Sequence, residues 1–119
     1  MKVEVRVTRN FRKEAKPLIK KYPSFLDDLT RLEKDLLSNP ELGESLGKNA
    51  RKLRLQIKSK GKGKSGGARV ISYIEKEIIA ITEVTEKLIV VNLLSVYDKA
   101  DKVSISDKEL KTLIENLEI

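Results

Sequence analysis

Hydrophobic and polar residues alternate in two segments of the chain that predict strands. Near the N-terminus, Val3, Val5 and Val7 are separated by charged residues, which is the period of a strand with one buried face. Residues 53–57 repeat the pattern, with leucine or isoleucine at every second position and arginine or glutamine between them. The second strand should therefore present one apolar face and one basic face.

A third segment, residues 68–97, is rich in valine and isoleucine. Within it, residues 88–97 are almost continuously apolar and predict a central strand that is covered on both faces. The whole segment predicts an extended hairpin that turns near residues 85–87. A turn at the charged residues 75–77 is the alternative.

The residues after the first strand predict a polar helix. Thr8 or Asn10 opens this helix, and its apolar positions continue to about Lys21. Pro17 should kink or shorten the helix, because proline has no amide hydrogen to donate to the helical ladder.

A second helix is predicted after a break at residues 22–24. Ser24 is a suitable N-cap, and Asp27 follows it at the spacing of a capping box. Asn39–Pro40 ends the helix, so the two helices are expected to form a hairpin. Four apolar residues share one face of this second helix: Phe25, Leu29, Leu32 and Leu36.

A last helix is predicted near the C-terminus, where Ser106 and Glu109 form a capping-box pattern ahead of an amphipathic segment. The chain should therefore form a single α+β domain over residues 1–119. Its expected order is an N-terminal strand, a helical hairpin, an antiparallel twisted sheet of three or four strands and a short C-terminal helix. The helices should lie on one face of the sheet.

Composition excludes several classes of chemistry. The 119 residues include no cysteine and no histidine, so the chain forms no disulfide and lacks the commonest general base and metal ligand. No apolar run is long enough to span a membrane, and the alternating N-terminus does not match a signal peptide. A cytoplasmic protein is expected.

Positive charge is concentrated in one quarter of the chain. Between Ser45 and Ile74 there are nine basic residues and no acidic one, whereas the rest of the chain carries 16 basic and 18 acidic residues. Concentrated charge of one sign attracts polyanions, so an anionic partner is indicated. The nine basic residues are Lys48, Arg51, Lys52, Arg54, Lys58, Lys60, Lys62, Lys64 and Arg69.

Strand alternation groups part of this charge. Lys52 and Arg54 point away from the buried face of the second strand, and Arg69 should lie close to them if the next strand pairs antiparallel. This face could simply be the solvated side of a sheet, but a surface built only for solubility normally mixes both signs of charge. Tyr97, at the end of the long apolar strand, is either a core residue or one that stacks on a base.

The segment KSKGKGKSGG, residues 58–67, is rich in glycine and lysine. Its spacing does not match a phosphate-binding P-loop, so nucleotide binding is not predicted. The segment is either a solvated connector or a flexible cationic loop that lies over a polyanion.

Two segments of the chain resemble a known family. GGARVI, residues 66–71, and YDKADKVSISDKEL, residues 97–110, are similar to the RelE/HigB-like branch of the RelE/ParE superfamily of bacterial type II toxins. The resemblance covers essentially the whole chain and implies a RelE-like fold. It also implies an endoribonuclease that cuts mRNA, often on the translating ribosome, without a metal or other cofactor. A cognate antitoxin protein would neutralise it.

The active site of that family is a basic concave sheet, and the resemblance places it on Lys52, Arg54, Arg69, Tyr97 and Lys99. Lys52 would be the general base, and the two arginines would hold the phosphate. Tyr97 or Lys99 would protonate the leaving group or orient the RNA. Five further residues are predicted to bind RNA around this site: Arg51, Lys58, Lys60, Lys62 and Lys64.

Two other functions stay open at this point. A gyrase poison of the ParE type would share the fold but lack the basic catalytic row. A non-catalytic module of the same fold would bind nucleic acid or a protein complex without cleaving RNA, and an inactive relic of a toxin would still bind its antitoxin. Cleavage of mRNA at defined positions separates the enzyme from both alternatives.

Overall fold

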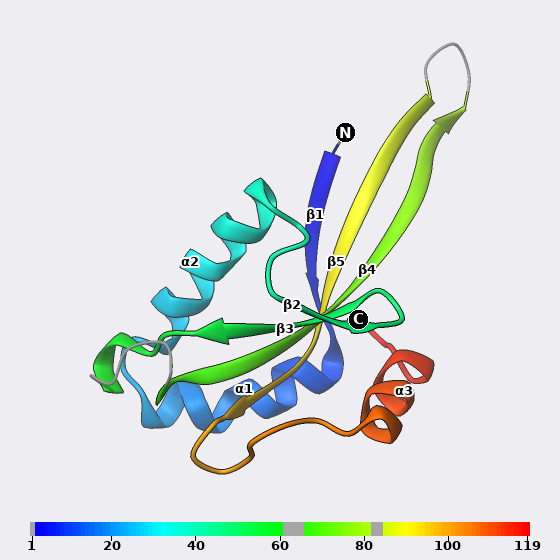
Figure 1. Ribbon diagram of the computed structural model, residues 1–119. Coiled ribbons are helices and arrows are strands. Elements are labelled where there is room, and N and C mark those ends of the chain that lie inside the picture. The colour runs from blue at the N-terminus through cyan, green and yellow to red at the C-terminus, as the bar shows by residue number, and fades with distance from the viewer. Residues whose placement is uncertain (1, 61–65, 82–84) are drawn as a thin grey trace.

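The computed structural model describes residues 2–60, 66–81 and 85–119 (Figure 1). These residues form the predicted α+β fold, in which an N-terminal strand, two helices, a sheet and a short final helix follow one another. The elements are β1 (Lys2–Val7), α1 (Arg9–Lys21), α2 (Phe25–Ser38), β2 (Glu44–Gly47), β3 (Ala50–Leu55), the 3₁₀ helix η1 (Lys58–Lys60), β4 (Ala68–Ile81), β5 (Thr85–Asp98) and α3 (Asp107–Glu115).

The described strands form one five-stranded sheet in the order β1-β5-β4-β3-β2. The strands from β2 to β5 pair antiparallel, as predicted, but β1 pairs parallel with β5. The sheet is therefore mixed. Parallel neighbours need a long crossover connection, and the helices and strands between β1 and β5 provide one.

The edge strand β2 lies between the second predicted helix and the second predicted strand, in a segment for which the sequence patterns predict no strand. Lys48 and Asn49 have positive φ angles of 56° and 63°, which is the pattern of a two-residue type I′ hairpin turn. This turn brings Glu44 opposite Lys52 in the sheet. The strand has only four residues and one half-buried position, which is why hydrophobic periodicity does not predict it.

The first two helices begin where predicted, but their ends are stabilised differently. Thr8 caps α1, and its hydroxyl accepts a hydrogen bond from the backbone N–H of Phe11. The helix continues through Pro17, so the predicted shortening does not occur. Ser24 precedes α2 without capping it. Its hydroxyl donates to Asp28 instead, because this carboxylate is fully buried and needs donors.

The two faces of the sheet bury separate apolar clusters. On one face α1 and α2 pack against the sheet, and Phe25 and Val91 are fully buried there. On the other face Leu110 of α3 packs with Ile71 and Tyr97. The prediction that all helices share one face is therefore wrong for α3. Its amphipathic pattern specifies that one side is buried but does not specify which face of the sheet covers it.

The strands β4 and β5 form the predicted hairpin, but the turn predicted near residues 85–87 is displaced toward the N-terminus, and the alternative turn at residues 75–77 is wrong. Residues 75–77 lie within β4 and residues 85–87 lie within β5, because pairing continues until Ile81 faces Thr85. The connection at residues 82–84 lies outside the described residues. Every residue from 88 to 97 is buried, which confirms the central strand. Figure 1 shows the hairpin extending beyond the helices.

Candidate functional site

Three neighbouring strands place polar side chains in one row on the sheet face that α3 covers in part. Arg54 of β3 lies opposite Arg69 of β4, and Arg69 lies opposite Tyr97 of β5. Lys52 occupies the next position on the same face of β3, opposite Ile71. The register thus brings Lys52, Arg54 and Arg69 together, as strand alternation predicts.

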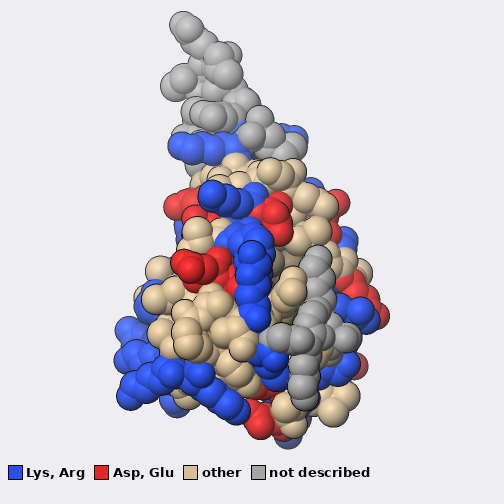
Figure 2. Space-filling view, turned by 90° about the vertical axis from the view of Figure 1, so that its left-hand side faces the viewer, with Lys and Arg blue, Asp and Glu red and all other residues tan. Residues whose placement is uncertain are grey.

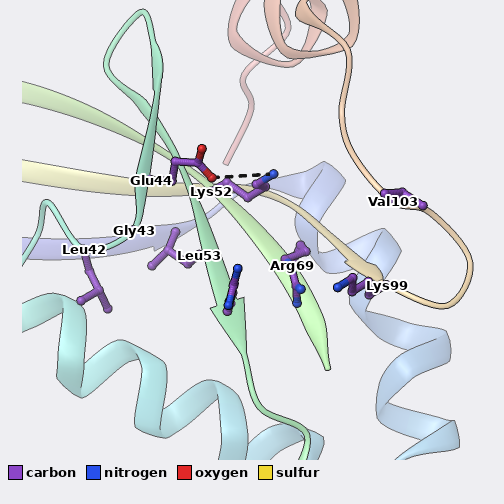
Figure 3. Close-up of a pocket in the computed structure, with 9 residues that line it drawn as sticks. Leu42, Gly43, Glu44, Lys52, Leu53, Arg69, Lys99 and Val103 are labelled. Carbon is purple, nitrogen blue, oxygen red and sulfur yellow. Dashed lines mark ion pairs between the residues drawn. The ribbon is translucent and has the colours of Figure 1, made fainter. Parts of the chain in front are cut away.

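Basic side chains from this row line a pocket of about 610 Å³, which we call the basic pocket. Figure 3 shows Lys52, Arg69 and Lys99 reaching it from different strands and from the segment after β5. Four of the five predicted catalytic residues therefore share one cavity. The lining consists of Leu42, Gly43, Glu44, Lys52, Leu53, Arg54, Arg69, Lys99 and Val103.

Two glycines allow the chain to approach β3 closely, and the first of them, Gly43, lines the basic pocket. Gly43 has a φ angle of +102°, and a Cβ there would lie 2.7 Å from the carbonyl oxygen of Lys52. A Cβ at Gly67 would lie 2.1 Å from the carbonyl oxygen of Leu55. Both distances are too short for a side chain, so only glycine fits. The second position gives a physical reason for a glycine in the segment GGARVI.

Glu44 is a pocket residue that the sequence does not single out. Its carboxylate lies 3.9 Å from the ammonium of Lys52, as the dashed line in Figure 3 marks. Within the described residues it is the one acidic side chain of the lining. A carboxylate at this place can accept a proton from a bound substrate. Sequence analysis missed it because its position depends on the β2–β3 register, and β2 itself was not predicted.

Arg54 and Arg69 form a pair of like charges across two strands. Arg54 is exposed, whereas Arg69 is 4% exposed and donates a hydrogen bond of 3.2 Å to the carbonyl of Ala68. Like charges that lie directly opposite one another destabilise a sheet. The arrangement is thus unfavourable for folding but well suited to holding an anion, since two guanidinium groups can donate to one phosphate.

Tyr97 does not line the basic pocket. Its ring packs with Leu110, is 7% exposed and lies 5.5 Å from the Lys102 ammonium. Burial raises the pKa of the Tyr97 phenol, against the opposing effect of the positive charges of Lys102 and Arg69. Its hydroxyl has no hydrogen-bond partner among the described residues. The structure thus places Tyr97 in a core cluster, and a catalytic role for it stays a prediction.

The residues predicted to bind RNA around the site do not line the basic pocket in the described part of the chain. Arg51 points to the opposite face of β3, where its guanidinium donates to a backbone carbonyl 3.0 Å away. Lys58 and Lys60 lie in η1, beyond the end of β3. Lys62 and Lys64 lie outside the described residues.

A buried ion pair fixes the end of β5, next to Lys99. Asp98 Oδ1 accepts a hydrogen bond of 2.7 Å from Lys60 Nζ, and Asp98 Oδ2 accepts one of 2.6 Å from Tyr22 Oη. Burial acts to raise the pKa of Asp98, but the bonds from Lys60, Tyr22 and a backbone amide outweigh it and hold the pKa at about 2. The bond to Asp98 also raises the pKa of Lys60. Lys60 therefore ties η1 to the strand end.

The low pKa of Asp98 predicts a loss of stability in acid. The carboxylate contributes fully above its ordinary pKa of 3.8, and the contribution disappears as the pH falls toward the folded-state value of about 2. A shift of this size corresponds to about 2 kcal/mol. Urea unfolding of the wild type and Asp98→Asn should show a difference in the free energy of unfolding that shrinks across this pH range. A constant difference would contradict the assignment.

No protein-family model matches the chain, and no curated protein is similar enough to count as a relative. The resemblance to the RelE/HigB-like toxins therefore stays a prediction from the sequence. Within the described residues, no group of three acidic side chains could hold a metal ion. The helices of that part of the chain are all too short or too polar to cross a membrane.

Proposed function

We propose that the chain is the toxin of a bacterial type II toxin–antitoxin system and cleaves mRNA in the basic pocket. The observation that carries the proposal is the convergence of four cationic side chains and one carboxylate on a single cavity. The cations can bind a phosphate and stabilise the charge that develops on it, and the carboxylate can accept a proton. The sequence resemblance supplies the substrate class, which is mRNA, often on the translating ribosome.

The proposed reaction is a transesterification within the RNA. The ribose 2′ oxygen attacks the adjacent phosphorus, the bond from phosphorus to the 5′ oxygen breaks, and the products are a 2′,3′-cyclic phosphate and a 5′ hydroxyl. Glu44 accepts the proton of the 2′ hydroxyl, and the Lys99 ammonium donates a proton to the departing 5′ oxygen. Arg54 and Arg69 hold the phosphate oxygens. Lys52, paired with Glu44, orients the carboxylate.

Replacing Glu44 by glutamine tests the proton acceptor. Glu44→Gln is expected to lower the cleavage rate about a hundredfold, because glutamine retains the shape of the side chain but does not accept the proton. Single-turnover cleavage of a short RNA measures the rate, and binding of the 2′-deoxy analogue should be unchanged. Glu41→Gln, an exposed change outside the pocket, is the matched control. A wild-type rate for Glu44→Gln would return the role of base to Lys52.

Inducible expression in bacteria, followed by primer extension on mRNA, tests the function as a whole. New 5′ ends within translated frames are expected for the wild type and should be absent for Arg54→Ala. Growth arrest without new ends would instead indicate a gyrase poison of the ParE type. Neither arrest nor cleavage would indicate a non-catalytic binding module.

The proposal includes a cognate antitoxin, because a free endoribonuclease of this kind would harm its own cell. The lining of the pocket, with four basic residues and one acidic residue, is complementary to an acidic segment of such a partner. Co-expression with the antitoxin should therefore restore growth and protect the mRNA.

A further inference from the structure

The charged side chains on the solvent-facing side of α1 are all positive. At 3.6 residues per turn these positions fall within an arc of about 100° and extend over about 16 Å, opposite the buried Phe11 and Leu18. Glu14, the one acidic residue of α1, accepts hydrogen bonds from Asn10 and Ser95 instead of pairing with these basic side chains. The α1 stripe consists of Arg9, Arg12, Lys13, Lys16 and Lys20, which are all exposed.

This stripe is unfavourable for the helix that carries it. Arg9 is the first residue of α1, and the first turn contains no acidic residue, although the positive end of the helix dipole favours negative charge there. Residues four apart, such as Lys16 and Lys20, carry like charges, and such pairs destabilise a helix. Helix stability therefore does not account for this choice of residues.

The other two helices mix both signs of charge on their exposed sides. On α2 and α3 these residues include Asp27, Glu33, Lys34, Asp35, Asp107, Lys108, Glu109 and Lys111. On α1, Arg9 pairs with Glu118 at 3.3 Å, but Lys13, Lys16 and Lys20 form no ion pair within the described residues. Figure 2 shows a dense group of basic side chains at the lower left, at the height that α1 has in Figure 1.

The position of the stripe separates it from the basic pocket. α1 packs on one face of the sheet, whereas Lys52, Arg54 and Arg69 lie on the opposite face. An RNA strand bound at the pocket therefore does not account for the stripe. We therefore expect the α1 stripe to contact a second anionic surface.

The chemistry of the stripe points to phosphate groups. Its five side chains include no aromatic group for stacking on single-stranded bases. Pro17 and Ile19 line a small apolar hollow beside Lys16 and Lys20, but α1 exposes no large apolar side chain of the kind that forms the centre of a protein–protein interface. Lysine and arginine in a straight row are suited to the regular phosphates of a double helix. We propose that the α1 stripe binds the phosphate backbone of duplex RNA. This proposal rests on the proposed function, because the duplex would belong to the folded RNA that surrounds the cleaved strand.

Fluorescence anisotropy with an RNA duplex of about 20 base pairs tests this proposal. The stripe variant combines Lys13→Gln, Lys16→Gln and Lys20→Gln, and the matched control combines Lys34→Gln, Lys108→Gln and Lys111→Gln. Both remove three positive charges. The stripe variant should bind the duplex at least tenfold more weakly, and the slope of log affinity against log salt concentration should decrease by about 2 to 3. The control should bind nearly as the wild type does.

Three results would overturn the assignment. The first is an unchanged affinity of the stripe variant for the duplex, and the second is an equal loss of affinity in both variants. The third is competition by polyglutamate that is as strong as competition by the duplex at equal charge, because this would indicate an acidic protein partner. Melting by circular dichroism should show no loss of stability in the stripe variant, because like-charge repulsion is relieved.

Cleavage of a short single-stranded RNA separates this inference from the proposed function. The stripe variant should cleave it at the wild-type rate, since the basic pocket is unchanged. Loss of cleavage in the stripe variant alone would mean that α1 belongs to the cleavage site, contrary to the proposal. Absence of cleavage of this RNA by the wild type, together with absence of new mRNA 5′ ends on expression, would remove the proposed function. Duplex binding would still decide the role of the stripe.

Discussion

Replacing Arg54 by alanine is expected to lower RNA cleavage about a thousandfold without loss of folded stability. Arg54 is exposed, lines the basic pocket and is proposed to hold the phosphate oxygens. It also lies directly opposite Arg69, so its removal relieves a repulsion between like charges. The melting temperature should therefore be unchanged or slightly higher. Single-turnover cleavage and thermal melting by circular dichroism measure the two quantities on the same preparations.

Two further variants sharpen this experiment. Arg54→Lys retains the charge but loses the planar pair of donors, so its cleavage rate should lie between those of the wild type and Arg54→Ala. Lys34→Ala removes one exposed charge from α2 and should leave the rate unchanged. Wild-type cleavage by Arg54→Ala would remove this residue from the mechanism. A loss of cleavage that merely follows unfolding would contradict the expected stability of this variant.

Replacing Asp98 by alanine is expected to lower the free energy of unfolding by about 3 kcal/mol. The variant leaves Lys60, which is 14% exposed, without its partner and removes the acceptor of the Tyr22 hydroxyl. An uncompensated cation is costly in such a place, although the remaining exposure of Lys60 limits the cost. Urea unfolding at neutral pH measures the change. Cleavage should also decline, because Lys99 follows Asp98 directly.

A double-mutant cycle shows whether the loss arises from the ion pair. Lys60→Met removes the cation but retains an apolar stem. If the pair couples the two residues, Asp98→Ala should cost much less in the Lys60→Met background than in the wild type. Additive effects would show that Asp98 acts through Tyr22 or the backbone and that Lys60 does not contribute.

Local sequence patterns predicted most of the secondary structure. Alternation over residues 3–7 and the apolar run at 88–97 correspond to β1 and β5. Alternation over residues 53–57 predicts β3, which begins earlier and ends at Leu55. The capping box at Ser106 and Glu109 forms as predicted. These features depend on residues within one or two turns of one another, so the sequence carries them directly.

The arrangement of these elements depended on contacts between distant residues. Parallel pairing of β1 with β5 joins residues such as Val5 and Val91, and no local pattern specifies that register. The same holds for the packing of α3 on its own face of the sheet and for β2, which is a strand only because it pairs with β3.

Some features of the candidate site likewise follow from local sequence, and others follow only from the tertiary structure. The sequence by itself determined that Lys52 and Arg54 share a face, because side chains alternate along a strand. Only the tertiary structure decided that Glu44 joins them, that Lys60 is tied to Asp98 and that Tyr97 is buried. Each of these three findings depends on sheet register or on packing between distant segments. Register and long-range packing are not encoded in neighbouring residues.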